Sequence, residues 1–126
     1  MSVFLSIVRA RNQLSSAAAI ALGRIGLPAI AGFVELLADS DPEVRLNALN
    51  GLAEMGQAAS SAVPQITKLL NDTDKRVCNA AVSLLGRIGP PAQSAIPALE
   101  ELRKQPDLNP LLNNAIDDTI KKVQAK

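Results

Sequence analysis

The chain has 126 residues, of which 13 are basic and 12 acidic, so its net charge of +1 offers no overall field for nucleic acid or an anionic membrane. Apolar residues make up 48% of the sequence and aromatic residues only 2%, which predicts a single domain with an aliphatic core. The single cysteine, Cys78, excludes an internal disulfide and suits a reducing compartment, which we take to be the cytoplasm. No stretch of about 18 uncharged apolar residues occurs, so no membrane-spanning helix is expected.

The N-terminal segment, residues 1–11, is rich in apolar side chains. They include Val3, Phe4 and Ile7, and together they occupy more of a helix than one neighbour can cover. Because an uncovered apolar patch usually marks an interface, this edge is expected to meet a second copy of the chain or a larger protein partner. The alternative is that the segment folds back onto its own chain.

Three short stretches that end in glycine reveal an internal repeat. "LGRIG" ends at Gly26 and again at Gly89, and "LAEMG" ends between them at Gly56. The flanking stretches "DSDPEV" and "DTDKRV" begin at Asp39 and Asp72, and the offset between these two starts is the repeat period. It falls within the range of about 20–50 residues that is typical of stacked repeats, here helical hairpins. Within one domain, 1–126, we assign three units at about 12–38, 39–71 and 72–104, followed by a C-terminal cap at 109–126.

The first helix of each unit is marked by periodicity and by its ends. Apolar residues recur at i, i+4, i+8 and i+11, one face of a helix, so burial is expected for Ala18, Leu22, Ala48, Leu52, Ala81 and Leu85. Asp41 and Asp74 stand at N-cap positions, and the three glycines above follow the last periodic residue, where a left-handed backbone ends a helix. Gly86 lies inside its helix, which predicts close approach of a neighbouring helix.

The second helices are predicted to be shorter, with apolar stripes such as Val63, Ile66 and Leu70. In the last segment an apolar stripe lies opposite polar residues, as expected for a capping helix. Breaks between helices are expected at 26–28, 38–41, 56–60, 71–74, 89–93 and 104–109.

The stretches "DPEVRLNALNGLAEMG" and "ALGRIG" resemble HEAT repeats, in the short variety found in phycobilisome lyases and many other proteins. The resemblance covers about residues 12–103 and implies an all-α, right-handed α-solenoid of about three helical hairpins with a capping helix. HEAT repeats often carry an Asp–Arg ladder between units. Arg45 fits that pattern, but Ser15 and Cys78 stand at the equivalent positions, so a continuous ladder is not expected.

No pattern in the chain predicts a catalytic, cofactor or metal site. The pairs Glu100–Glu101 and Asp117–Asp118 are adjacent on helices, so their side chains point about 100° apart. The Asp-x-Asp stretches at Asp39 and Asp72 fit helix capping better than a calcium site, which needs six or more oxygen ligands. Cys78 follows two basic residues that would favour a thiolate, but an ordinary helix position is the preferred interpretation.

Two rows of charge follow from the alignment of the units. Glu35, Lys68 and Glu101 are each one repeat period apart and lie opposite the apolar stripes of successive second helices. A second row, Arg24, Glu54 and Arg87, lies near the ends of successive first helices. Each row alternates in sign, which predicts one charged row on each face of the solenoid.

The expected function is a non-enzymatic protein-interaction module or assembly scaffold without a cofactor, which presents a curved surface made from its second helices. Two alternatives stay open. The family resemblance admits an accessory subunit of a bilin lyase or similar modifying enzyme. The three arginines before the first acidic residue, Glu35, admit a nucleic-acid-binding solenoid, but aromatic residues for base stacking are too few to favour it.

Overall fold

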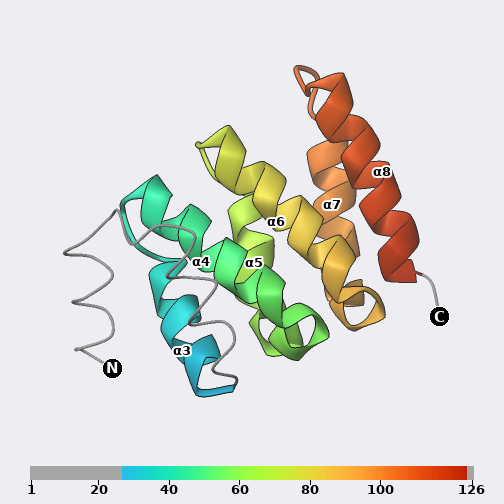
Figure 1. Ribbon diagram of the computed structural model, residues 1–126. Coiled ribbons are helices and arrows are strands. Elements are labelled where there is room, and N and C mark those ends of the chain that lie inside the picture. The colour runs from blue at the N-terminus through green and yellow to red at the C-terminus, as the bar shows by residue number, and fades with distance from the viewer. Residues whose placement is uncertain (1–26, 125–126) are drawn as a thin grey trace.

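The computed structural model describes residues 27–124, whose helices form two layers (Figure 1). One layer contains the longer helices α4 (Pro42–Met55), α6 (Lys75–Ile88) and α8 (Pro110–Gln124). The other contains the shorter helices α3 (Leu27–Leu36), α5 (Val63–Lys68) and α7 (Ile96–Arg103). Each long helix packs against neighbours in both layers, and no strand occurs between residues 27 and 124. The predicted all-α solenoid is confirmed.

The long helices α4 and α6 begin at side-chain N-caps, as the sequence predicts. The carboxylate of Asp41 accepts a hydrogen bond from the backbone N–H of Glu43 at 2.9 Å, and that of Asp74 accepts one from Arg76 at 2.9 Å. Pro42 occupies the first position of α4, where its missing N–H leaves no hydrogen bond unmade. These caps fix the residue at which each helix begins, and therefore which side chains face the neighbouring unit.

Glycine ends both helices, although not in the predicted backbone conformation. Gly56 and Gly89 have positive φ values of 57° and 79°, but their ψ values are −130° and −144°. The left-handed helical conformation would need ψ near about +47°. The observed region is open almost exclusively to glycine, because a side chain there would clash with the backbone. Gly26 lies outside the described residues.

Two of the predicted breaks contain 3₁₀ helical turns instead of open loops, and the second has a kink at Ala92. After Gly56 and Gly89 the chain forms the 3₁₀ segments η1 (Gly56–Ala62) and η3 (Pro90–Ala95). In a 3₁₀ helix, residues three apart face the same side. Ala59 and Ala62 are such a pair, and both are fully buried. The small apolar residues therefore favour a 3₁₀ segment that packs on the core instead of an open loop. A shorter segment, η2 (Leu69–Asn71), ends the helix α5.

The core is one continuous aliphatic cluster that runs through both layers. Ala48, Leu52, Ala81 and Leu85 are each at most 1% exposed, as predicted, whereas Ala18 and Leu22 lie outside the described residues. The second helices contribute the fully buried side chains Phe33, Ile66 and Leu99, each one repeat period after the last. Because these three positions are equivalent, α3, α5 and α7 present equivalent faces away from the core.

Gly86 lies where α8 packs closely against α6. A Cβ atom at this position would lie 3.3 Å from Thr119 Oγ1 and 3.5 Å from Cδ of Lys122. Thr119 is 4% exposed, and its hydroxyl donates a hydrogen bond to the Val82 carbonyl of α6 at 3.2 Å. The predicted reason for a glycine inside this helix is therefore confirmed.

The helix α8 begins in the same way as α4 and α6. The side chain of Asn109 accepts a hydrogen bond from the backbone N–H of Leu111 at 2.8 Å, in the position that Asp41 and Asp74 occupy before the earlier helices. Asp107 precedes Asn109 by two residues, as Asp72 precedes Asp74. The segment therefore resembles the first helix of a further unit. Its outer face is polar as predicted, except that Leu111 is 78% exposed.

A side-chain pair joins the unit at 39–71 to the unit at 72–104. Arg45 donates hydrogen bonds to both carboxylate oxygens of Asp72, at 2.8 and 3.0 Å, and to the backbone carbonyl of Asp39 at 2.7 Å. At the equivalent position in the next unit, Cys78 is 3% exposed and its thiol donates to the Leu70 carbonyl at 3.3 Å. Within residues 27–124 the Asp–Arg ladder thus has a single rung.

Candidate protein-binding surfaces

The second-helix surface carries the predicted row of charge. Glu35 on α3, Lys68 on α5 and Glu101 on α7 are all exposed. Each lies two residues after one of the three fully buried core positions, so the packing of the core sets the direction in which each helix presents its charge. The structure therefore places these three candidate residues on equivalent faces of successive helices.

The three charges do not neutralise one another. Within the described part of the chain no ion pair joins Glu35, Lys68 and Glu101. The carboxylate of Glu101 instead lies 3.7 Å from the ammonium group of Lys104, three residues further along the chain. Exposed pairs of that kind contribute little, about 0–1 kcal/mol. The side chains thus stay available to a partner. The other candidate binding residues, Val3, Phe4 and Ile7, lie outside the described residues.

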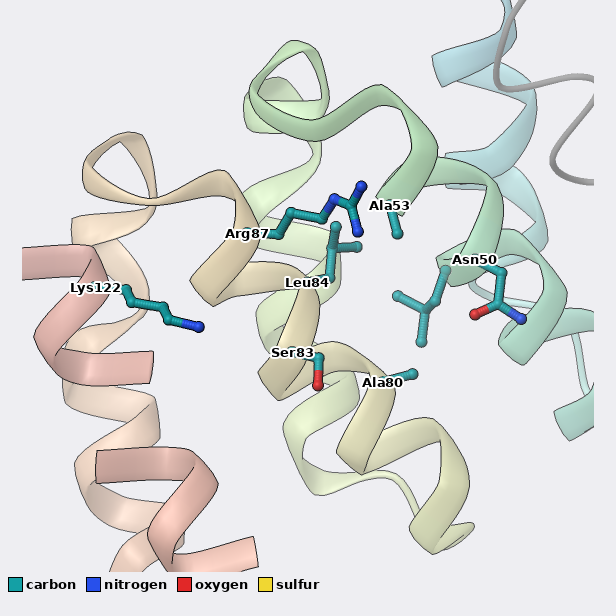
Figure 2. A pocket seen from close by; sticks show the side chains of 8 residues that line it. Asn50, Ala53, Ala80, Ser83, Leu84, Arg87 and Lys122 are labelled. Atoms are coloured by element: carbon teal, nitrogen blue, oxygen red, sulfur yellow. The ribbon is translucent and has the colours of Figure 1, made fainter. Parts of the chain in front are cut away.

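A groove lies on the opposite layer, which contains α4, α6 and α8 (Figure 1), and Figure 2 shows side chains that line it. Its volume is about 470 Å³, and the residues that line it are Leu49, Asn50, Ala53, Ala80, Ser83, Leu84, Arg87 and Lys122. The hollow exists because Ala53, Ala80 and Ser83 are too small to fill the space between neighbouring first helices. Volumes of about 300–1,000 Å³ are typical of ligand pockets.

Arg87, a member of the second predicted row, lines this groove. Figure 2 shows its side chain extending from α6 toward Ala53 of α4, while Lys122 extends from α8 toward α6. Sequence reasoning placed Arg87 near a helix end but did not find the groove, because its shape depends on how closely the helices approach. Of the other two members, Glu54 is exposed on α4 and Arg24 lies outside the described residues.

Several acidic side chains of the described region have partners within the fold. Asp41 and Asp74 cap helices, Asp72 binds Arg45, and Asp117 pairs with Arg103. Adjacent carboxylates diverge as predicted, because Asp118 pairs with Lys122 at 3.2 Å on its own helix and not with the partner of Asp117. Between residues 27 and 124 no group of three or more histidine, cysteine or acidic side chains could hold a metal ion.

The thiol of Cys78 does not match the profile of a reactive cysteine. It is buried, and burial raises its pKa above the ordinary value, an effect that the nearby Lys75 opposes. A raised pKa disfavours the thiolate, and only the thiolate is a strong nucleophile. The side chain acts instead as a small core residue at the position that Arg45 occupies in the preceding unit.

The two-layered stack of helical hairpins defines the chain as an α-solenoid. A family model for HEAT repeats matches residues 30–117, and the chain belongs to the HEAT repeat family. No curated protein matches the sequence. Among the helices of the described region, none is both long enough and apolar enough to cross a membrane.

Proposed function

We propose that the protein is a non-enzymatic interaction module that presents its second-helix surface to a protein partner. The observation that supports this most directly is the row formed by Glu35, Lys68 and Glu101, exposed on equivalent faces of three helices that a continuous core holds in place. HEAT repeats generally mediate contacts between proteins, and a solenoid offers an extended surface for them. The role of an assembly scaffold fits the same surface.

The use of the charged groups supports a role without chemistry of its own. The carboxylates at the starts of α4 and α6 form helix caps and the contact with Arg45, so they are engaged in structural hydrogen bonds. The free, buried thiol of Cys78 suits a reducing compartment, which favours the cytoplasm as the place of action.

The test is a charge reversal in the middle of the row. Lys68→Glu leaves three acidic side chains in line. The affinity for a partner whose charges complement the alternating row should fall at least about tenfold, because the new glutamate faces the partner's acidic group and like charges across an interface repel. The matched control is Lys121→Glu, the same change at an exposed site on α8 in the opposite layer.

The measurement compares the three proteins as affinity baits in extract from the native source, read by quantitative mass spectrometry. A protein that binds the wild type and Lys121→Glu but is lost from Lys68→Glu supports the proposal. Equal recovery of every specific partner on all three baits contradicts it. Recovery of a bilin-modifying enzyme, or salt-sensitive retention of DNA, would instead support one of the two alternative functions.

A further inference from the structure

The groove on the first-helix layer combines an apolar floor with unused polar groups. Leu49 and Leu84 are 1% and 2% exposed, so their side chains form a floor fixed by the core. The Ser83 hydroxyl and the Asn50 amide line the same groove and make no hydrogen bond within the described residues. Unused donors and acceptors beside an apolar floor are the features that recognise a peptide backbone and its side chain.

The groove also carries an unpaired positive charge. Four arginines lie between residues 27 and 124, and three of them bind carboxylates: Arg45, Arg76 and Arg103. Arg87 alone among these four has no ion pair or hydrogen bond. Its guanidinium lies over the groove, between α6 and α4 (Figure 2). By charge complementarity, a ligand in the groove should therefore place a negative charge beside the Arg87 guanidinium.

A second cation lies on the α8 side of the groove. The stem of Lys122 passes over Gly86, where the missing side chain leaves room for it. The Lys122 ammonium group is 3.2 Å from Asp118, so its charge is partly used within α8. The groove thus has one full positive charge at Arg87 and a weaker one at Lys122, which together suit a single negative charge.

The helix ends restrict the kind of anion. Arg87 lies in the last turn of α6 and Lys122 in the last turn of α8, where the carbonyl ends of the helices carry partial negative charge. This partial negative charge disfavours a doubly charged phosphate more than a singly charged carboxylate, which the planar guanidinium can bind through two parallel hydrogen bonds.

We propose that this groove binds an acidic peptide segment of a protein partner. A carboxylate of the peptide pairs with Arg87, an adjacent aliphatic side chain packs on Leu49 and Leu84, and Ser83 and Asn50 bond its backbone. The site is independent of the row that includes Lys68, because it lies on the opposite layer of helices (Figure 1). It would remain a second docking site whichever partner occupies the second-helix surface.

The test uses the full chain and three defined probes, followed by amide chemical shifts in NMR spectra. The probes are acetyl-Leu-Glu-Ala-Leu-amide, which carries one carboxylate, its analogue with glutamine in place of glutamate, and inorganic phosphate. The acidic peptide should shift the amides of Asn50, Ala53 and Ser83. The glutamine analogue should bind about tenfold more weakly, because it lacks the charge-assisted hydrogen bond to arginine.

Variants separate charge from shape. Arg87→Gln should weaken the acidic peptide about tenfold, and Lys122→Gln should weaken it less. The control Lys121→Gln removes the same charge from the neighbouring residue outside the groove and should leave affinity unchanged. Ala80→Leu fills the groove without changing charge and should also weaken binding, with folding checked by circular dichroism.

Three results would overturn the proposal. The first is an absence of shifts in the groove at about 5 mM acidic peptide, a concentration that would reveal a Kd near 1 mM. The second is equal affinity of the wild type and Arg87→Gln. The third is that phosphate produces the same shifts as the peptide at the same concentration, which would make the groove a general anion site.

Discussion

At the scale of single residues, the contact between Arg45 and Asp72 is the most specific link between two units. The side chains are 14% and 7% exposed, so water screens their charges less than it does those of an exposed pair. Arg45 also binds the carbonyl of Asp39, which ties the start of its own helix to the same guanidinium. Removing the Arg45 side chain deprives the Asp72 carboxylate and the Asp39 carbonyl of this shared donor.

We therefore expect Arg45→Ala to lower the free energy of unfolding by about 2 kcal/mol, since hydrogen bonds to charged groups contribute about 1.5–3 kcal/mol. Urea denaturation followed by circular dichroism measures this. The control is Arg103→Ala, which breaks the exposed pair with Asp117 and should cost clearly less. Equal losses for the two variants would mean that the rung adds nothing beyond an ordinary surface pair.

At the scale of helices, the cap of α6 couples stability to pH. Asp74 has a pKa below its ordinary value, chiefly because the side chain of Arg76 hydrogen-bonds its carboxylate. A carboxyl group whose pKa is lowered in the folded state stabilises the fold above the unfolded pKa of about 3.9. That contribution disappears as the pH falls through the lower folded pKa, where the group becomes protonated in both states.

The variant Asp74→Asn tests this coupling, because asparagine caps helices about as well as aspartate but carries no charge. It should be less stable than the wild type at neutral pH, and the difference should vanish in strong acid. Thermal unfolding of both proteins between about pH 2 and pH 6 covers the range in which an aspartate titrates. A constant difference across that range would show that the charge on Asp74 does not contribute.

The helices whose apolar residues repeat regularly were predictable from the sequence. Burial at Ala48, Ala81 and their neighbours follows from periodicity alone, since one face of a helix must pack. The 3₁₀ segments were not predictable in the same way, because glycine also marks open loops and only packing of Ala59 and Ala62 selects the tighter form. The repeat start before α8 was obscured because Asp107 lies slightly more than one repeat period after Asp72.

The two candidate surfaces also differ in whether the sequence could predict them. The row of Glu35, Lys68 and Glu101 could be predicted because equivalent positions in equivalent helices must face alike. The groove could not, because it arises from the space that Ala53 and Ala80 leave between helices far apart in sequence. Small residues at these positions are a signal, but small residues equally permit close packing without a hollow, as Gly86 shows.

At the scale of the whole molecule, stability is shared between neighbours along a line. The helix α6 contacts both α4 and α8, whereas no direct packing comparable to these joins α4 to α8. In such an array, stability is approximately the sum of each unit's own stability and the interfaces on its two sides. A substitution that destabilises one unit should therefore affect the stability of the next unit mainly through the interface that the two units share.

The rung between Arg45 and Asp72 gives the unit at 39–71 a property that the unit at 72–104 lacks. Asp39 holds the N–H of Asp41 at 2.9 Å, just as Asp72 holds that of Asp74 at 2.8 Å, so the two carboxylates are equivalent acceptors. The unit at 39–71 thus carries an acceptor on one side and a donor, Arg45, on the other. We therefore expect the unit to dock head to tail onto a copy of itself, whereas Cys78 offers the next unit no arginine for such a contact.

This makes the unit a building block from which longer rods can be assembled. A second copy of residues 39–71 inserted after Asn71 lengthens the chain by one full repeat. The Arg45 side chain of the first copy would then bind the Asp39 carboxylate of the second copy, and the equivalent arginine of the second copy would bind Asp72. We expect the elongated protein to fold, to gain helical signal in proportion to its length, and to melt at a higher temperature, because one complete interface is added. Circular dichroism and small-angle scattering would measure these changes; a lower melting temperature would show that the two sides of the unit do not match. The spacing of any partner sites along the rod would then be set by the number of copies.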